Sequence, residues 1–362
     1  MGCYFDEFST IQIRLKNGEY MNRRDFLSIG LGAATIAFPY SVIANQGKDS
    51  LNGYDIDLTG QKDSTDEFQR LLNDAAVSAR PVPNGMQKAL VIIHGIIRVS
   101  KTLIIDASRV NILGPATIYF SKQALGINYG IILNNNSLKN VSFTNGVGSL
   151  FDSVNFFTEI KINLFFASNI KTSDTNPSCL INISQCRFTG FDKIFTNGAG
   201  GWGWNWDRCG FDECSWLLYI TQQMDSYERF SFTSCIWQNG GTAFYVDNPF
   251  GKIYWTAGSF DYCDAIAYIK RGYVSVSGHL EFKKRQKPAV TLLSDDCHFY
   301  FLGGSIYAIN CSEPFTLFKQ YSNDQITIRD VNFMYDKVND GVVTLSNMNL
   351  ETNSILFKKR QR

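Results

Sequence analysis

The chain has 362 residues, with 34 lysines and arginines against 33 aspartates and glutamates, so its formal net charge is only +1. This balance argues against a nucleic-acid or anionic-membrane partner, because both attract proteins with an excess of positive charge. Aromatic residues make up 14% of the chain, and Asn, Ser, Thr and Gly recur throughout. The composition predicts an all-β protein with many turns.

The segment Met21–Ala44 has the parts of an export signal: two arginines at 23 and 24, an apolar run and small residues at its end. The run Arg-Arg-Asp-Phe-Leu resembles the twin-arginine signal family, whose substrates cross the membrane already folded through the twin-arginine translocase. We expect cleavage after Ala44 and a periplasmic or secreted protein. The alternative is an uncleaved membrane anchor, since the stretch is close to the minimum spanning length.

Residues 1–20 resemble neither a signal nor a domain. The codons of Gly18-Glu19 can form a purine-rich ribosome-binding sequence just before the Met21 codon. We therefore expect translation to start at Met21, with 1–20 a mis-called extension and 45–362 a single domain. Sequencing the N-terminus of the precursor would test this start.

One segment is predicted to be helical, at about 64–78. Its apolar residues have the i, i+3, i+4, i+7 spacing of one helix face, at Phe68, Leu71, Leu72 and Ala75. Ser64 and Glu67 fit a capping box at its start. Short apolar strands follow, which predicts β coils at about 88–350.

A three-residue motif repeats along the chain: a small or apolar residue, any residue, then a large apolar one. Its regular copies begin at Val141, Cys186, Cys209, Cys235, Gly258, Gly304 and Val331. Two less regular copies begin at Ile162 and Gly278, and the spacings run from 20 to 27 residues. Such a period, with several strands per repeat, predicts a β-solenoid, and right-handed crossovers favour its right-handed form.

The helix start Asp63-Ser64-Thr65-Asp66 and the strand-rich stretches 91–100 and 110–114 resemble the pectate-lyase-like superfamily, which includes bacteriophage tailspike depolymerases. The resemblance implies a single-stranded right-handed parallel β-helix in which helix 64–78 caps the N-terminal end, and it leaves a homotrimer open. The family includes hydrolases, lyases, epimerases, esterases and inactive members. Fold alone does not choose among these activities.

Eight cysteines follow Ala44, an even number that invites disulfides in an oxidising compartment. However, Cys186, Cys209 and Cys235 open motif copies, two residues before a Phe or Trp. Period-2 alternation puts both positions on the buried face, so we expect buried thiols that act as small hydrophobic residues. Adjacent coils are close enough for a bridge. No Cys or His spacing fits a metal site, so none is predicted.

If motif positions one and three face inward, positions two and four face outward. The fourth position then forms a column with Asp212, Gln238, Asp261 and Glu281 on four consecutive coils, beside His279 at a second position. Like charges on neighbouring strands destabilise a sheet and raise the pKa of one partner, as a general acid requires. We therefore predict Asp212, Asp261 and Glu281 as catalytic, and Gln238 and His279 as substrate-binding.

The spacing of these acids allows two mechanisms. Asp261 and Glu281, one coil apart, approach the ~5 Å of a retaining glycosidase, and Asp212 and Asp261, two coils apart, approach the ~9 Å of an inverting one. A merely solvated polar surface is the plain alternative.

Aromatic residues near this column are predicted to bind sugar rings. Trp202 and Trp204 lie outside the apolar register and are expected to be exposed stacking platforms, whereas Trp206 is expected in the core. A second ladder is predicted on three consecutive coils, at Tyr219, Tyr245 and Tyr268.

These features predict an exported protein that acts on polysaccharide, foremost a glycoside hydrolase or depolymerase of a surface or extracellular polysaccharide. A polysaccharide lyase is one alternative; it would need Ca²⁺ near Asp or Glu and a base such as Arg187, Lys270 or Arg271. A non-catalytic accessory role in exopolysaccharide or capsule biosynthesis is the other, because twin-arginine β-helix proteins resemble accessory proteins of colanic-acid-type biosynthesis. No cofactor is predicted for the hydrolase.

Overall fold

The computed structural model describes residues 53–82, 85–134, 149–167, 181–198, 203–221, 229–282, 288–308, 315–321 and 325–335, with short strands at 13–14, 20–21, 41–42, 343–345, 349–350 and 355–359. The chain divides into two units, Met1–Ser41 and Val42–Arg362. In the first, β1 (Ile13–Arg14) pairs antiparallel with β2 (Tyr20–Met21). Apart from these strands and β3 (Ser41–Val42), the predicted extension and export signal lie outside the described residues. Within the described part of the chain, no helix is both long and apolar enough to cross a membrane.

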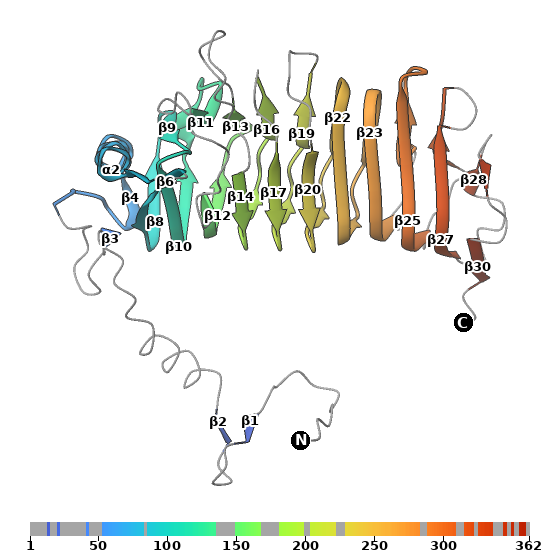
Figure 1. The fold of residues 1–362 in the computed structure, drawn as a ribbon, viewed down its shortest axis with the longest axis horizontal. Helices are drawn as coiled ribbons and strands as arrows, with labels where there is room; N and C mark the ends of the chain where they lie inside the picture. The colour runs from blue at the N-terminus through green and yellow to red at the C-terminus, as the bar shows by residue number, and fades with distance from the viewer. Residues whose placement is uncertain are drawn as a thin grey trace. The chain divides into compact units, whose positions relative to one another are not determined.

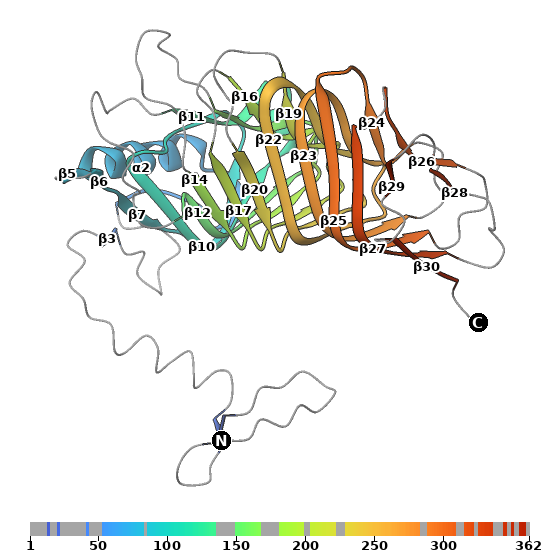
Figure 2. The same cartoon turned by 45° about the vertical axis from the view of Figure 1, so that its right-hand side comes forward.

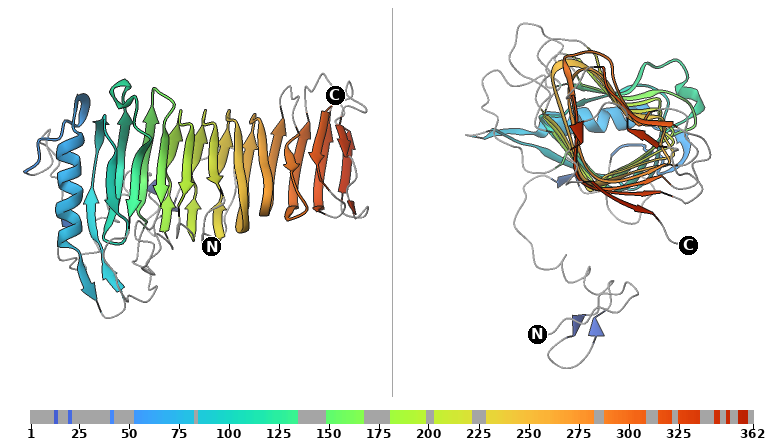
Figure 3. Two further views of the ribbon diagram at one scale, coloured as in Figure 1. Left: turned by 90° about the horizontal axis from the view of Figure 1, so that it is seen from above. Right: turned by 90° about the vertical axis from the view of Figure 1, so that its right-hand side faces the viewer.

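The second unit is a right-handed parallel β-helix, as predicted (Figure 1). Each coil contributes strands to three rows, and strands of one row pair in parallel from coil to coil. Seen along the stack, successive coils superimpose (Figure 3). Successive coils lie side by side along the stack in Figure 2, so residues about 25 positions apart in sequence become neighbours in space.

Short strands make up much of each row. The first row contains β7 (Ala89–Ile92), β14 (Ile181–Ser184), β17 (Trp204–Asp207), β20 (Arg229–Thr233) and β29 (Asn349–Leu350). The second row contains β4 (Thr59–Asp63), β8 (Gly95–Val99), β15 (Arg187–Thr189), β18 (Gly210–Asp212), β21 (Ile236–Gln238) and β30 (Ile355–Lys359). The third row contains β9 (Leu103–Asp106), β11 (Tyr129–Asn134), β13 (Asn163–Ala167), β16 (Lys193–Asn197), β19 (Trp216–Ile220), β24 (Val290–Leu292), β26 (Phe315–Lys319) and β28 (Val343–Leu345).

Longer strands bend from one row into the next. First and second rows are joined by β10 (Val110–Phe120), β12 (Phe151–Thr158), β25 (Cys297–Ala308) and β27 (Ile326–Tyr335). Strands that begin in the third row and continue through the next coil are β22 (Thr242–Asp261) and β23 (Ala265–Phe282). Outside the rows lie a hairpin and one 3-10 turn: β5 (Arg80–Val82), β6 (Gly85–Gln87) and η1 (Lys122–Ala124).

Helix α2 (Thr65–Ser78) lies across the N-terminal end of the coils, where its predicted apolar face is buried (Figure 3). The capping-box prediction is wrong, because Ser64 makes no side-chain cap hydrogen bond. Its Oγ instead accepts the Asp57 N–H at 2.9 Å, and the Glu67 carboxylate accepts from Arg70 at 2.6 Å. At the helix start the side-chain acceptor is Asp63 instead, whose carboxylate accepts the Thr65 N–H at 3.0 Å.

The repeated motif forms the second row, and its third positions are buried as predicted. The first position is buried where it is cysteine or valine, but the prediction is wrong for the copies that begin with glycine: Gly258 and Gly278 are partly exposed and Gly304 is exposed. Phe188, for example, is fully buried and stacks on Phe156 at 5.0 Å and on Phe211 at 5.1 Å between ring centres. The irregular copy at Gly278 is confirmed in this row. The copy at Ile162 is wrong, because β13 belongs to the third row and Phe156 holds that coil's motif position. The copy at 141–143 lies outside the described residues.

The cysteines inside the stack are buried and unbridged, as predicted. Free thiols are found at Cys186, Cys209, Cys214, Cys235, Cys263 and Cys297. Burial raises the pKa of Cys186 and of Cys214 to about 12 in each case. A thiol that stays protonated is a poor nucleophile for disulfide exchange, so these residues act as small core side chains.

A buried ion pair fixes the end of the third-row part of β22. Asp247 is 8% exposed and accepts from Arg271 at 2.7 Å and Lys270 at 3.2 Å. Burial alone would raise the pKa of Asp247, but the hydrogen bonds from Arg271 and Lys270 outweigh it and lower the pKa below its ordinary 3.8. The ionised carboxylate therefore stabilises the fold above pH 3.8, and this stabilisation is lost as pH falls through the folded-state pKa.

We expect Asp247→Ala to lower the free energy of unfolding by about 1–3 kcal/mol at neutral pH, because it removes the carboxylate that accepts from the largely buried Arg271 and from the half-exposed Lys270. The difference from the unsubstituted protein should shrink as pH falls through the folded-state pKa of Asp247, which lies below 3.8, because the carboxyl then becomes protonated. Urea titrations followed by circular dichroism at neutral pH and below that pKa measure this. Asp207→Ala is the control, since its pair with Arg208 is 41% exposed on the acid side and should contribute less than about 1 kcal/mol. Equal losses in the two variants would contradict the expectation.

Candidate functional site

The outward side of the second row, here called the second-row face, carries the predicted column of polar residues. The fourth motif positions are in register from coil to coil, in the order Thr189, Asp212, Gln238, Asp261, Glu281, Tyr307 and Met334. Each of them is partly exposed. The predicted geometry of the column is therefore confirmed, because parallel pairing holds every copy of the motif in the same register.

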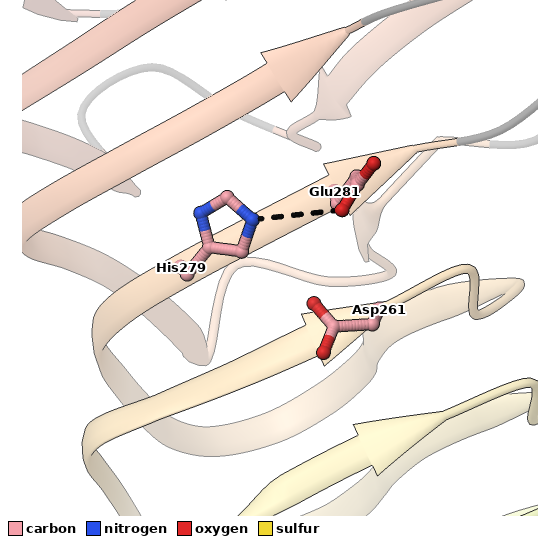
Figure 4. Close-up of side chains that lie close together, drawn as sticks. All are labelled: Asp261, His279 and Glu281. Carbon is pink, nitrogen blue, oxygen red and sulfur yellow. Dashed lines mark ion pairs between the residues drawn. The ribbon is translucent and has the colours of Figure 1, made fainter. Parts of the chain in front are cut away.

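Asp261 and Glu281, here called the carboxylate pair, face each other on adjacent coils with His279 beside them (Figure 4). Oxygen or nitrogen atoms of the three side chains all lie within 4.8 Å of one another. The imidazole Nε2 of His279 is 3.8 Å from Glu281 Oε2, and its Nδ1 is 3.0 Å from Ser305 Oγ. Glu281 is 29% exposed and His279 is 32% exposed, so a ligand on this face can reach both.

Two hydroxyl groups, which the sequence analysis missed, hold the carboxylate pair. Ser259 Oγ donates to Asp261 Oδ2 at 2.8 Å, and Tyr262 donates its phenolic O–H to Glu281 Oε1 at 3.0 Å. The hydrogen bond to Glu281 raises the pKa of Tyr262. Tyr262 follows the fourth motif position directly and has a left-handed φ of 56°. This backbone turn directs the Tyr262 side chain toward Glu281 on the next coil. In the sequence, a tyrosine directly after the fourth motif position could have indicated this contact.

Asp212, two coils from Asp261, lies in a different environment. Its carboxylate accepts from Arg187 at 2.9 Å and from Asn239 at 3.0 Å. Burial would raise the pKa of Asp212, but the hydrogen bonds from Asn239 and Arg187 outweigh burial and lower it. A carboxylate kept ionised in this way is unsuited to donate a proton near neutral pH. Among the three predicted catalytic acids, this environment favours Asp212 for binding a ligand.

The predicted tryptophan platform is not formed by Trp204. Trp202 lies outside the described residues, and the prediction that Trp204 is exposed is wrong, because it is fully buried. In β17 the side chains alternate, so Trp204 and Trp206 point to the same inner face and both join the core. Because the two residues are two positions apart on one strand, the correct prediction that Trp206 is buried implies that Trp204 is buried as well.

The predicted tyrosine ladder exists but lies on the third row, away from the carboxylate pair. Tyr219, Tyr245 and Tyr268 are in register, and the first two rings stack at 4.7 Å with an angle of 15°. Trp216, also unpredicted, packs edge-on against Tyr219 and Tyr245. Stacked rings cover one another's faces, which leaves edges and hydroxyl groups for solvent. The structure therefore does not bring these tyrosines together with the acids.

Aromatic rings do lie on the second-row face, in the same column as the acids. Toward the N-terminal end, Tyr119 and Phe157 stack at 5.5 Å, and Phe157 is 40% exposed. On the other side of the acids, the ring of Tyr307 lies 4.6 Å from that of His279. The column thus has ring surfaces on both sides of its polar centre, an arrangement that suits an extended sugar chain.

The carboxylate pair and His279 can also be considered as metal ligands, since they offer three donor atoms close together. Ca²⁺ prefers oxygen ligands, six to eight in number, so the imidazole nitrogen does not fit the ion that a lyase would need. Two carboxylates and one imidazole resemble the donor set of a transition-metal site more closely. The carboxylates alone remain available to Ca²⁺.

No protein-family model matches the chain, and none of the curated proteins matches it. Among solved structures, the chain is similar to the enzymatically active domain of tailspike protein 4 of bacteriophage CBA120, with 16% identity and a TM-score of 0.46. It is also similar to tailspike protein 3 of that phage, with 12% identity and a TM-score of 0.36. The matches cover 75% and 97% of this chain but only 42% and 62% of those proteins. The chain therefore spans less than two thirds of either one.

Proposed function

We propose that this protein is a polysaccharide-cleaving glycoside hydrolase whose catalytic groups are Asp261 and Glu281. The observation that carries the proposal is their geometry: two partly exposed carboxylates on adjacent coils, with oxygens within 4.8 Å. This separation is close to the ~5 Å of retaining enzymes and too short for a water molecule to attack between the two groups. The proposed outcome is hydrolysis with retention of the anomeric configuration.

The hydrogen bonds suggest a division of roles. Glu281 accepts the Tyr262 hydroxyl at 3.0 Å and faces the His279 ring, and these contacts on both sides hold its carboxylate in one orientation for attack on the sugar. Glu281 is therefore proposed as the nucleophile. Asp261 has one hydroxyl donor, from Ser259, and is proposed to protonate the leaving oxygen and then to activate water.

The length of the second-row face supports a polymer as substrate. The column from Tyr119 to Tyr307 includes eight successive coils, which at ~4.8 Å per coil span roughly 34 Å. Polar side chains and aromatic rings along this distance can bind several sugar units in a row. The export signal expected at Met21–Ala44 would place this activity in the periplasm or outside the cell.

The test is incubation of the protein, with and without EDTA, with the surface polysaccharide of the strain that produces it. New reducing ends that form equally with EDTA and without ultraviolet-absorbing unsaturated ends support the hydrolase. Unsaturated uronic products with ultraviolet absorbance, formed only with Ca²⁺, would assign a lyase instead. Binding without any decrease in polymer size would assign the accessory role and overturn the proposal.

A further inference from the structure

A pocket of about 240 Å³ opens on the second-row face, separate from the carboxylate pair. Its lining includes Arg187, Arg208, Gly210, Asp212, Ile236 and Gln238. The pocket exists because Gly210 lies in register between Arg187 and Ile236 at the second motif position. Where the neighbouring coils carry long side chains, this coil carries none, which leaves a gap of roughly two coil spacings, ~10 Å.

Two guanidinium groups border this gap. The side chain of Arg187 is 58% exposed and that of Arg208 is 60% exposed. Each makes an ion pair with an acid, Arg187 with Asp212 at 2.9 Å and Arg208 with Asp207 at 2.8 Å. The pair of Arg208 with Asp207 is exposed on both sides and therefore weak, and every guanidinium has five N–H donors. Each arginine can therefore keep its partner and still donate to a ligand oxygen.

The lining favours a negatively charged ligand group. Arg187 and Arg208 border the pocket, and of the two acids that pair with them only Asp212 belongs to the lining, whereas Asp207 does not. The planar fork of a guanidinium matches a carboxylate geometrically. Gln238 adds an amide to the lining, and Ile236, 43% exposed, adds an apolar surface for a sugar ring.

We propose that this pocket is a subsite for the carboxylate of an acidic sugar unit, so that the substrate class is an acidic polysaccharide. This inference rests on the proposed function, which makes the substrate a polysaccharide, and it adds that the polysaccharide is negatively charged. Asp212 and Asp261 are two coils apart, which is roughly 10 Å. A chain lying along the column can therefore place one acidic unit at the arginines while another bond lies at the carboxylate pair.

The test compares binding of paired probes to a cleavage-deficient Glu281→Gln protein. The probes are oligomers of galacturonic, glucuronic and mannuronic acid, each with its carboxyl-reduced neutral counterpart, and calorimetry gives the affinities at about 0.01 M and about 1 M salt. We expect an acidic oligomer to bind about tenfold more tightly than its neutral counterpart at low salt. This preference should fall at high salt, where exposed charges are screened.

Three further variants locate the preference. Arg187→Gln with Arg208→Gln should abolish it, and Gly210→Leu should do so by filling the pocket. A Cβ at Gly210 would meet only the Arg187 Cγ, at 3.9 Å, so this variant should fold normally. Asn332→Leu introduces the same side chain at an exposed second motif position five coils away and should leave the preference unchanged.

Equal affinity for every acidic and neutral pair, absence of binding to all of them, or a preference that persists in the double arginine variant would overturn the subsite. The proposed reaction is judged separately, from reducing ends released by the unsubstituted protein. Hydrolysis without charge preference overturns the subsite alone. Charge-dependent binding without hydrolysis supports the subsite and overturns the hydrolase.

Discussion

Asp261→Asn and Glu281→Gln are each expected to lower kcat by about 10²–10⁴-fold, with little change in stability. The large effect follows because each variant removes a group that must transfer a proton or attack the sugar. The fold should tolerate both changes, because the two side chains are partly exposed and face outward. Reducing-end assays on the cleaved polysaccharide give kcat and KM, and thermal melts followed by circular dichroism report on folding.

Asp212→Asn is the matched control, since it makes the same chemical change in the same column two coils away. Because Asp212 lines the proposed pocket and lies two coils from the carboxylate pair, its change should alter KM more than kcat. Product anomers followed by nuclear magnetic resonance should show retained configuration. Full activity in both Asp261→Asn and Glu281→Gln would show that the carboxylate pair is not the catalytic site, and inverted products would remove the retaining mechanism.

Phe156→Ala is expected to lower the free energy of unfolding by about 3–5 kcal/mol. The Phe156 ring is 1% exposed and is enclosed by other rings, 5.0 Å from Phe151 and 5.0 Å from Phe188 between centres. Removing the ring leaves a cavity in the core of the coils. The coils on either side cannot move together to fill this cavity without losing their strand register. Urea unfolding measured by circular dichroism and by tryptophan fluorescence gives the change.

The neighbouring Phe157→Ala provides a control on the same strand. Phe157 points outward and is 40% exposed, so its loss should reduce stability by less than about 1.5 kcal/mol, the worth of its stacking on Tyr119. If the two variants were equally stable, the assignment of inward and outward positions in β12 would be wrong. If Phe157→Ala raised KM, the ring would also contribute to substrate binding.

Much of the fold could be predicted from the spacing of the repeated motif alone. The motif copies that begin at Cys186, Cys209 and Cys235 are in register in the structure, and their inner positions are buried. The column with Asp261 and Glu281 followed from the same alternation. A parallel solenoid repeats one environment on every coil, so each copy of the motif reinforces the same interpretation.

Single copies and local contacts were less predictable. The motif copy at Ile162 matched the pattern but belongs to another row, because a three-residue pattern does not distinguish one buried strand from another. The capping box at Ser64 matched its signature, yet the helix start is held by Asp63. Trp204 was expected to be exposed because it lies outside the apolar register of Trp206, yet strand alternation puts both residues on the same inner face.

The sequence by itself determined which side chains face the core of the coils and which acids share a column, because strand alternation and a constant repeat fix both. Only the tertiary structure decided that Tyr262 and Ser259 bind the carboxylate pair, that Arg187 neutralises Asp212, and that the tyrosine ladder lies on a different row. These contacts depend on the turn at each corner and on side chains from neighbouring coils. Arg187 and Asp212 are 25 residues apart and Tyr262 and Glu281 are 19 residues apart. Periodicity carries no information about the direction in which such side chains turn, and this holds also for Ser259, two residues from Asp261.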